Sequence, residues 1–350
     1  MQRLLRLLVV LCAAAGFHAP GLAADAREAA PAGRLSEEGF VRIGGIDQWL
    51  TIHGAEARNP VILFLHGGPG DALSPYADSM FGGWDNDFTL VQWDQRGAGR
   101  TYGRSGPSIE STITMDRMMQ DGIEVAEHLI RRLGQRKVIV VGMSWGSMLG
   151  VHMVKRRPDL FHAYLGLAQI VNWRAGSTAS YARLLELARA AADKPLVDLL
   201  EAIGSPPWDS LLKWPRFRKP LMAYQQKRVT AAPVVLSVAP AYASPAERDQ
   251  YAEADDFSFL HWMGITMSGP LLQIDLPSLG TDFAIPFYII QGQEDLVALP
   301  ELAKAYVDAV TAPRKRFVAV PGTGHEPSID QLDLALRLLR QEIRPLSLAR

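Results

Sequence analysis

The sequence has little cysteine and almost no net charge. Its only cysteine is Cys12, so neither a disulfide framework nor a cysteine-rich metal site is expected. Lysines and arginines number 36 against 37 aspartates and glutamates, and such balance gives no basis for binding nucleic acid. No cluster of histidines stands at metal-ligand spacing, and no glycine-rich phosphate-binding loop precedes a helix. We therefore expect no metal and no cofactor.

Long apolar runs are also missing, apart from a short one near the N-terminus. Residues 7–15 are apolar, follow Arg3 and Arg6, and precede small residues at Gly21, Ala23 and Ala24. This order is typical of a secretory signal peptide, and the run falls short of the ~20 residues that a membrane span needs. We expect residues 1–24 to be removed, Cys12 with them, and the protein to reach the periplasm or the medium without stable membrane association. Residues 25–35 would form a linker.

The rest of the chain alternates strand and helix patterns. Residues 40–43 and 48–53 predict an antiparallel hairpin across Gly44-Gly45. Further strands are predicted at residues 61–65, 89–93, 138–141, 164–168, 286–291 and 316–320, with helices at 115–133, 147–153, 299–310 and 329–343. This alternation predicts an α/β protein with a mostly parallel, eight-stranded sheet flanked by helices. The core would comprise residues 36–172 and 283–350. Residues 173–282, which fit no strand–helix unit, would form an inserted helical cap.

A Gly-x-Ser-x-Gly pattern joins a predicted strand to a predicted helix. It is Gly142-Met143-Ser144-Trp145-Gly146, and at this position it predicts a nucleophile elbow. Glycines are needed because a β-carbon at either end of so tight a turn would crowd the neighbouring backbone. Ser144 is therefore the candidate nucleophile.

Two later loops supply the groups that a serine nucleophile requires. Asp295 follows the strand at 286–291 and His325 follows the strand at 316–320. The order serine, acid, histidine is that of α/β-hydrolase triads, with His325 as base and Asp295 as its orienting acid. Glu294 is the rival acid, whereas the alternative acid position after the strand at 164–168 holds the uncharged Asn172. Because parallel strands end at one sheet edge, these loops should meet there.

The segment His66-Gly67-Gly68-Pro69-Gly70 follows another predicted strand. Its glycines allow the backbone to approach a substrate carbonyl. We expect an oxyanion hole made by the N–H group of Gly67 or Gly68 and that of Trp145. His66 would orient the loop. The turn after the strand at 89–93 is expected to be structural, held by Asp94 and Arg96.

Together the motifs HGGPG, DQRGAGRT and GMSWGS resemble the proline iminopeptidase family of α/β-hydrolases. The segments GQED and GTGH agree with that family's acid and base positions. The resemblance covers residues 36–172 and 283–347, and it implies an α/β-hydrolase fold. It also implies release of an N-terminal residue, typically proline, from short peptides through an acyl-enzyme, with acidic cap residues holding the substrate's amine.

The sequence departs from that family in the DQRG turn and in the cap. Ala98 stands where the family often has cysteine, and residues 213–218, KWPRFR, are basic in place of a tryptophan–glutamate segment. The candidate substrate-binding residues of the cap are Glu186, Glu253, Trp208 and Trp262. Asp255 and Asp256, which neighbour Glu253, are further candidates for holding an ammonium group.

An alternative is a carboxylesterase or lactonase that uses the same triad on small esters. Tryptophans and methionines of the cap would then form an apolar acyl pocket, namely Trp208, Trp214, Trp262, Met263 and Met267. A hydrolase fold retained only for binding is a third possibility, although such proteins usually lose a triad residue. Haloalkane dehalogenase and epoxide hydrolase chemistry requires a carboxylate at the elbow, and Ser144 argues against both.

Overall fold

The computed structural model describes residues 33–348. The predicted signal peptide and residues 25–32 of the predicted linker lie outside the described residues. Leu35, assigned above to the linker, is already the first residue of strand β1 (Leu35–Ile43). Among the described residues, no helix has the length and apolarity needed to cross a membrane.

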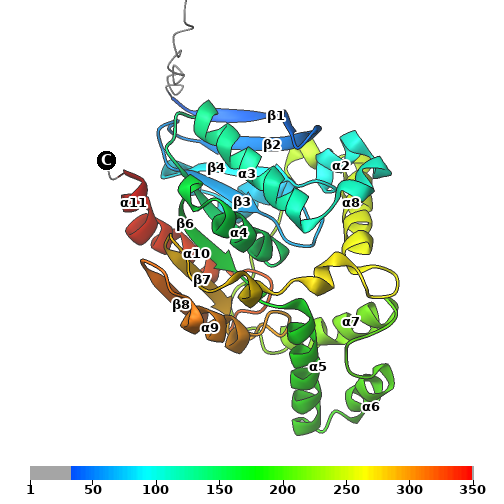
Figure 1. Cartoon of the computed structure of the whole chain (residues 1–350). Coiled ribbons are helices and arrows are strands. Elements are labelled where there is room, and N and C mark those ends of the chain that lie inside the picture. The colour runs from blue at the N-terminus through cyan, green and yellow to red at the C-terminus, as the bar shows by residue number, and fades with distance from the viewer. Residues whose placement is uncertain (1–32, 349–350) are drawn as a thin grey trace, which may run out of the picture.

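Eight strands form one sheet (Figure 1). Its order is β1-β2-β4-β3-β5-β6-β7-β8, in which β1 and β2 run antiparallel to their neighbours and the remaining pairs are parallel. The prediction of a mostly parallel, eight-stranded sheet that begins with an antiparallel hairpin is therefore confirmed. The other strands are β2 (Ile46–Gly54), β3 (Val61–Leu65), β4 (Thr89–Asp94), β5 (Val138–Met143), β6 (Phe161–Leu167), β7 (Phe287–Gly292) and β8 (Lys315–Val320).

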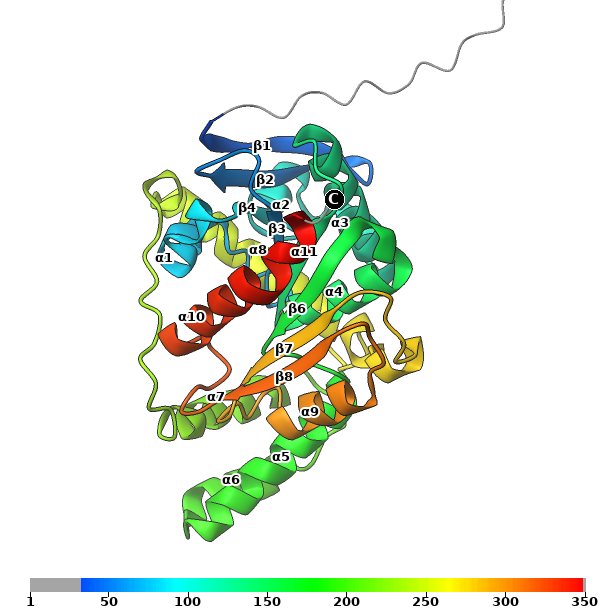
Figure 2. The same cartoon turned by 90° about the vertical axis from the view of Figure 1, so that its left-hand side faces the viewer.

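Helices cover both faces of the sheet (Figures 1 and 2). Alternate strand residues point to opposite faces, so Leu63 and Val140 enter one core cluster and Phe64 and Val141 the other. The first cluster is closed by α3 (Met115–Arg132), α4 (Trp145–Arg156) and α9 (Pro300–Ala309), and the second by α1 (Ala77–Phe81) and α10 (Ile329–Leu338). Burial on both faces explains the uninterrupted apolar strands in the sequence.

The chain between β6 and β7 contains the cap segment, residues 173–282. Its longer helices are α5 (Trp173–Ala190), α6 (Lys194–Ile203), α7 (Lys213–Gln226) and α8 (Pro245–Met263). In both views α5 and α6 extend away from the sheet, while α7 and α8 lie closer to it (Figures 1 and 2). Helix α8 packs on α2 (Gly99–Ser105), where Ser258 donates a hydrogen bond to the Gly97 carbonyl at 2.8 Å.

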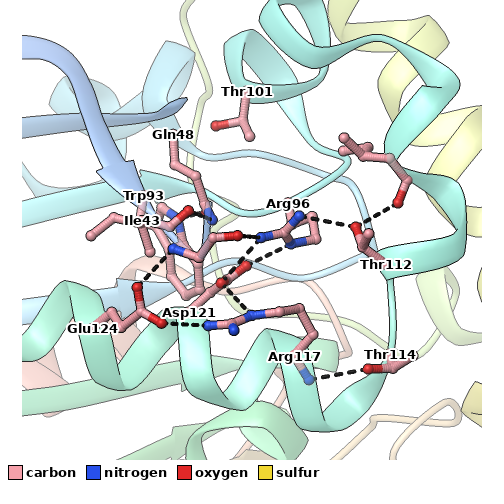
Figure 3. A network of polar contacts seen from close by, with 12 residues as sticks. Ile43, Gln48, Trp93, Arg96, Thr101, Thr112, Thr114, Arg117, Asp121 and Glu124 are labelled. Atoms are coloured by element: carbon pink, nitrogen blue, oxygen red, sulfur yellow. Dashed lines mark hydrogen bonds and ion pairs between the residues drawn. The ribbon is translucent and has the colours of Figure 1, made fainter. Parts of the chain in front are cut away.

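A buried polar network fixes the turn after β4 (Figure 3). The Arg96 guanidinium binds Asp121 of α3 at 2.7 Å and the Gly44 carbonyl at 2.7 Å. Arg117 also contacts Asp121, at 2.8 Å. Asp94 accepts hydrogen bonds from the Arg100 N–H and the Tyr251 hydroxyl, at 2.9 and 2.8 Å. These contacts support the predicted structural role of Asp94 and Arg96 in holding the turn.

Candidate active site

Ser144 lies in the turn between β5 and α4. Its φ angle is +50°, a value rarely adopted by residues other than glycine. A β-carbon on Gly142 would lie 2.5 Å from the Gly146 carbonyl oxygen, and one on Gly146 would lie 2.0 Å from the Leu65 carbonyl oxygen. Only glycine fits at these two positions, as the sequence pattern indicates. The turn holds Ser144 at the N-terminus of α4, where the helix dipole favours negative charge.

A chain of hydrogen bonds joins Ser144 to Asp295 through His325. The Ser144 Oγ atom lies 3.0 Å from His325 Nε2, and His325 Nδ1 lies 2.9 Å from Asp295 Oδ2. The side chains of His325 and Asp295 are almost fully buried. The three residues predicted as nucleophile, base and acid are thus brought into direct contact from three separate loops.

Asp295 is held in place by its own loop. Its Oδ1 atom accepts hydrogen bonds from the N–H groups of Val297 and Ala298, each at 2.8 Å, and Gln291 donates to Oδ2 at 2.9 Å. A carboxylate held in this way accepts from Nδ1–H of His325, which leaves Nε2 free to accept the Ser144 proton. Glu294, the rival acid, instead forms an ion pair with Arg228.

The HGGPG loop lies beside Ser144. A β-carbon on Gly67 would be 3.5 Å from the Ser144 β-carbon, so this loop borders the nucleophile. Gly68 has a φ of +101°, and a side chain there would meet the Gly70 and Asp71 backbone at 2.6 and 2.7 Å. Gly67 thus borders Ser144, and Trp145 directly follows the serine. The oxyanion hole formed by Gly67 or Gly68 and Trp145 stays a prediction.

His66 and Gln95 connect this loop to the elbow. His66 Nδ1 lies 2.9 Å from the Gly67 carbonyl, and the Gln95 N–H donates to His66 Nε2 at 3.2 Å. Burial lowers the pKa of His66 to about 4, so the ring is neutral near pH 7, with Nδ1 as its donor. The Trp145 indole donates to Gln95 Oε1 at 3.0 Å. His66 thus orients the loop, as expected, and has no contact with Ser144 among the hydrogen bonds of the described chain.

The predicted substrate-binding residues of the cap are not gathered around Ser144. Glu186 points outward, with 68% of its side chain exposed and an ion pair to Arg183, because it lies on the solvent face of α5. Glu253 accepts a hydrogen bond from the Tyr102 hydroxyl at 2.8 Å, which directs it toward α2.

The two tryptophans named above belong to the packed interior. Trp208 is buried, packs against Phe217 and donates to the Gly204 carbonyl. Trp262 is fully buried and lies 4.4 Å from Trp145, measured between ring centroids. Trp262 therefore supports the elbow from the cap side, whereas the contacts of Trp208 lie within the cap.

An acidic pocket lies next to the HGGPG loop. It measures about 280 Å³, and its lining includes Gly70, Asp71, Tyr251 and Asp255. One cation, Arg248, also lines it, so the two carboxylates outnumber a single guanidinium. Desolvation inside the pocket, and then the charges of Asp255 and Glu326, raise the pKa of Asp71 to about 6. Desolvation and the charge of Asp256 also raise the pKa of Asp255. The sequence analysis named Asp255 but missed Asp71 and Glu326. Their positions directly after HGGPG and after His325 were the available signal.

Within residues 33–348, no group of histidine, cysteine, aspartate or glutamate side chains is arranged to hold a metal ion. The arrangement described so far consists of a hydrogen-bonded serine, backbone donors and nearby carboxylates. These groups are suited to acyl transfer by a serine nucleophile.

The chain matches the family described as "alpha/beta hydrolase fold" over residues 60–332. It belongs to that family. This α/β-hydrolase is 27% identical over 309 residues to a probable aminopeptidase, YbaC, of Bacillus subtilis. The match covers 86% of this chain and 94% of the relative. It is 33% identical over 120 residues to the proline iminopeptidase of Saccharolobus solfataricus, covering 33% of this chain and 35% of the relative.

Solved structures show the same fold. The crystal structure of a proline iminopeptidase from Mycobacterium smegmatis matches this α/β-hydrolase with a TM-score of 0.65 and 22% identity, covering 89% of this chain and 99% of the other. The resemblance to proline iminopeptidases expected from the motifs is thus confirmed.

Proposed function

We propose that this α/β-hydrolase is a serine aminopeptidase of the proline iminopeptidase type, which releases an N-terminal residue, with proline as the first candidate, from short peptides. The observation that carries the proposal is the hydrogen-bonded chain from Ser144 through His325 to Asp295. Similarity to a probable aminopeptidase over most of both chains supports the peptide substrate.

In the proposed mechanism, Ser144 attacks the scissile carbonyl carbon while His325 Nε2 accepts the hydroxyl proton. Asp295 orients the ring and stabilises the imidazolium that forms. The N–H groups of Trp145 and of Gly67 or Gly68 stabilise the oxyanion. His325 then donates its proton to the leaving amine, and a water molecule releases the N-terminal residue from the acyl-enzyme by the same steps in reverse order.

The acidic pocket would hold the substrate's ammonium group. Asp71 adjoins the loop proposed to bind the oxyanion, and Asp255 faces the same pocket from α8. Two carboxylates close enough for their charges to interact favour a cation between them. We assign the amine to these residues in place of Glu186 and Glu253, whose side chains are engaged elsewhere.

The esterase alternative depends on an apolar acyl pocket in the cap. Four of the five residues named for it, Trp208, Trp262, Met263 and Met267, are buried and serve as packing. The fifth, Trp214, is partly exposed and lines a cavity of about 20 Å³ with Trp173 and Phe217. This favours the peptidase over the esterase.

Turnover of proline p-nitroanilide beside that of p-nitrophenyl butyrate tests the proposal. We expect the amide to be cleaved, and cleavage to stop when the proline nitrogen is acetylated, because the amide loses its positive charge. Cleavage of the ester alone would reject the aminopeptidase and leave a carboxylesterase. The Ser144→Ala variant supplies the blank for both substrates.

The route of export is a separate proposal. We propose that residues 1–24 direct secretion and are cleaved. N-terminal sequencing of the protein recovered from the periplasm or the medium would then begin near Asp25. Recovery of the intact chain from the cytosol alone would contradict this.

A further inference from the structure

Arg218 lies on the face of α7 that is turned toward the triad loops. Residues 218, 221 and 225 are spaced by three and four positions, so they share one side of the helix. Gln225 accepts a hydrogen bond from the N–H of Leu296, the neighbour of Asp295, at 2.9 Å. Its amide also lies 2.6 Å from where a β-carbon on Gly324, the neighbour of His325, would be. This side of α7 therefore contacts both loops.

The guanidinium of Arg218 has no ion-pair partner among the described residues. Its Nη1 atom is buried and makes no hydrogen bond within the protein. By contrast Arg228, near the end of the same helix, pairs with Glu294. The carboxylates whose charges act on Arg218 are those of Glu326 and Asp295, in agreement with its place on the side of α7 that contacts both loops. A desolvated cation with an unused donor is costly unless something pairs with it.

A carboxylate is the group best matched to such a donor, because a guanidinium offers two parallel N–H groups in a fixed plane. We propose that Arg218 binds a carboxylate of the substrate, namely the C-terminal carboxylate of a dipeptide, which is carried by the amino acid that leaves when the peptide bond is cleaved. This inference rests on the proposed aminopeptidase function. It gives a role to one residue of the basic segment 213–218, namely Arg218.

The charges around the site are then complementary to a zwitterion. Asp71 and Asp255 line the pocket beside α8, whereas Arg218 lies on α7, so the acidic and the basic groups come from different elements. A dipeptide carries a cation at one end and an anion at the other, with its single peptide bond between them. The enzyme would therefore prefer free dipeptides to amidated or longer peptides.

Binding to a Ser144→Ala protein tests this without any catalysis. Calorimetry would compare prolylglycine with prolylglycinamide, which differ only in the carboxylate. We expect the free acid to bind about 10- to 100-fold more tightly, the range for hydrogen bonds to charged groups. Adding Arg218→Gln should remove this preference and leave affinity for the amide unchanged. Equal binding of acid and amide before the second substitution would overturn the inference.

Arg216→Gln is the matched control. Arg216 is exposed on the same helix, so the variant removes the same charge without touching the site and should keep the preference. Arg218→Lys should keep only part of it, since an ammonium cannot bind bidentately. An Arg218→Gln variant that weakens both ligands equally, or that unfolds at a lower temperature, would assign Arg218 to structure and overturn the inference.

A third ligand distinguishes recognition of a C-terminal carboxylate from recognition of a side-chain carboxylate. The α-amide of prolylglutamate carries its carboxylate only on the side chain, and we expect it to bind as weakly as prolylglycinamide. Binding as tight as that of prolylglycine would overturn the assignment to the C-terminus. If wild-type enzyme cleaves none of these peptides but the Arg218-dependent preference is measured, the proposed function fails while the carboxylate site stands. If the enzyme cleaves these peptides but binds the free acid and the amide equally, the proposed function stands and the carboxylate site fails.

Discussion

At the scale of single residues, the structure concentrates its unusual geometry at Ser144. Its positive φ angle and its 3.0 Å contact with His325 Nε2 occur at one turn, and backbone strain of this kind is found where function maintains it. The two flanking glycines could be predicted because their requirement is local. The role of the serine between them could also be predicted, because the Gly-x-Ser-x-Gly pattern between a strand and a helix indicates a nucleophile elbow.

Replacing Ser144 by alanine should abolish turnover and leave the fold intact. Removing a triad nucleophile typically costs roughly three to six orders of magnitude in kcat, and the missing Oγ atom is a small change in packing. Activity assays and a urea unfolding curve on the same preparation would check both halves. Retention of a tenth of the activity would remove Ser144 from the mechanism.

Binding of an amine substrate should depend on the ionisation of Asp71. Because its pKa is raised to about 6, the side chain is neutral below that pH and anionic above it. KM for proline p-nitroanilide should therefore fall as pH rises through about 6, while KM for a neutral ester stays constant. Asp71→Asn should raise KM for the amide above pH 6 and remove its pH dependence. A pH-dependent KM in that variant would exclude Asp71 as the titrating group.

The same shift predicts a change in stability. Between the ordinary carboxyl pKa of 3.8 and about 6, the unfolded chain loses the Asp71 proton while the folded chain retains it, so this residue makes folding less favourable as pH rises. Asp71→Asn should thus raise the unfolding midpoint at pH 7 and have little effect at pH 4. Urea titrations at the two pH values measure this difference.

Residues of the cap could not be placed in the same way. Whether a carboxylate on α5 or α8 faces the site depends on how each helix is rotated against the core, which apolar spacing indicates only weakly when both faces are partly covered. The prediction of Glu186 and Glu253 as substrate-binding residues rests on residue type alone. In the structure Glu186 pairs with Arg183 at the surface, and Glu253 accepts a hydrogen bond from Tyr102. Arg218 became recognisable only when loops distant in sequence were brought together, whereas Asp71 could have been found from its position directly after HGGPG.

At the scale of elements, strands were predicted better than short helices. Strands β3 and β5 are buried along their whole length, and an apolar run bounded by polar turns is typical of that environment. Helix α2 was missed because Gly99 and Gly103 favour a turn. Its surroundings explain the glycines, since a β-carbon on Gly99 would lie 2.3 Å from Asp94 and one on Gly103 would lie 2.2 Å from Gln250.

The network that holds β4, α3 and the β1–β2 turn should be important for stability. Arg96→Ala removes one member of a fully buried ion pair. Breaking such pairs costs ~3–5 kcal/mol, and we expect the lower end because Arg117 still contacts Asp121. Urea unfolding would measure the loss. The exposed pair of Arg42 with Asp47 is the control, and Arg42→Ala should change stability by less than about 1 kcal/mol.

At the scale of the whole molecule, two helices of the cap segment contact different parts of the core. Helix α8 packs on α2 and on the turn after β4, and α7 contacts the loops that carry Asp295 and His325. The first contact positions the acidic pocket, whereas the second supports the triad.

Gln225→Ala should therefore affect both stability and rate. The Leu296 N–H would lose its buried acceptor, which costs about 1–3 kcal/mol, and the freed loop should lower kcat more than it changes KM. Gln226→Ala, at the exposed neighbouring position, is the matched control and should change neither. Steady-state kinetics and thermal unfolding of the pair would check this. Equal effects of the two variants would contradict a specific contact.

Insertion of the cap between β6 and β7 also sets the order in which the active groups are synthesised. Ser144 precedes 110 residues of cap, and His325 follows the last strand. A growing polypeptide therefore makes its nucleophile early and its base almost at the end. From residue 144 to residue 325, roughly half of translation, the nascent chain has Ser144 but lacks His325.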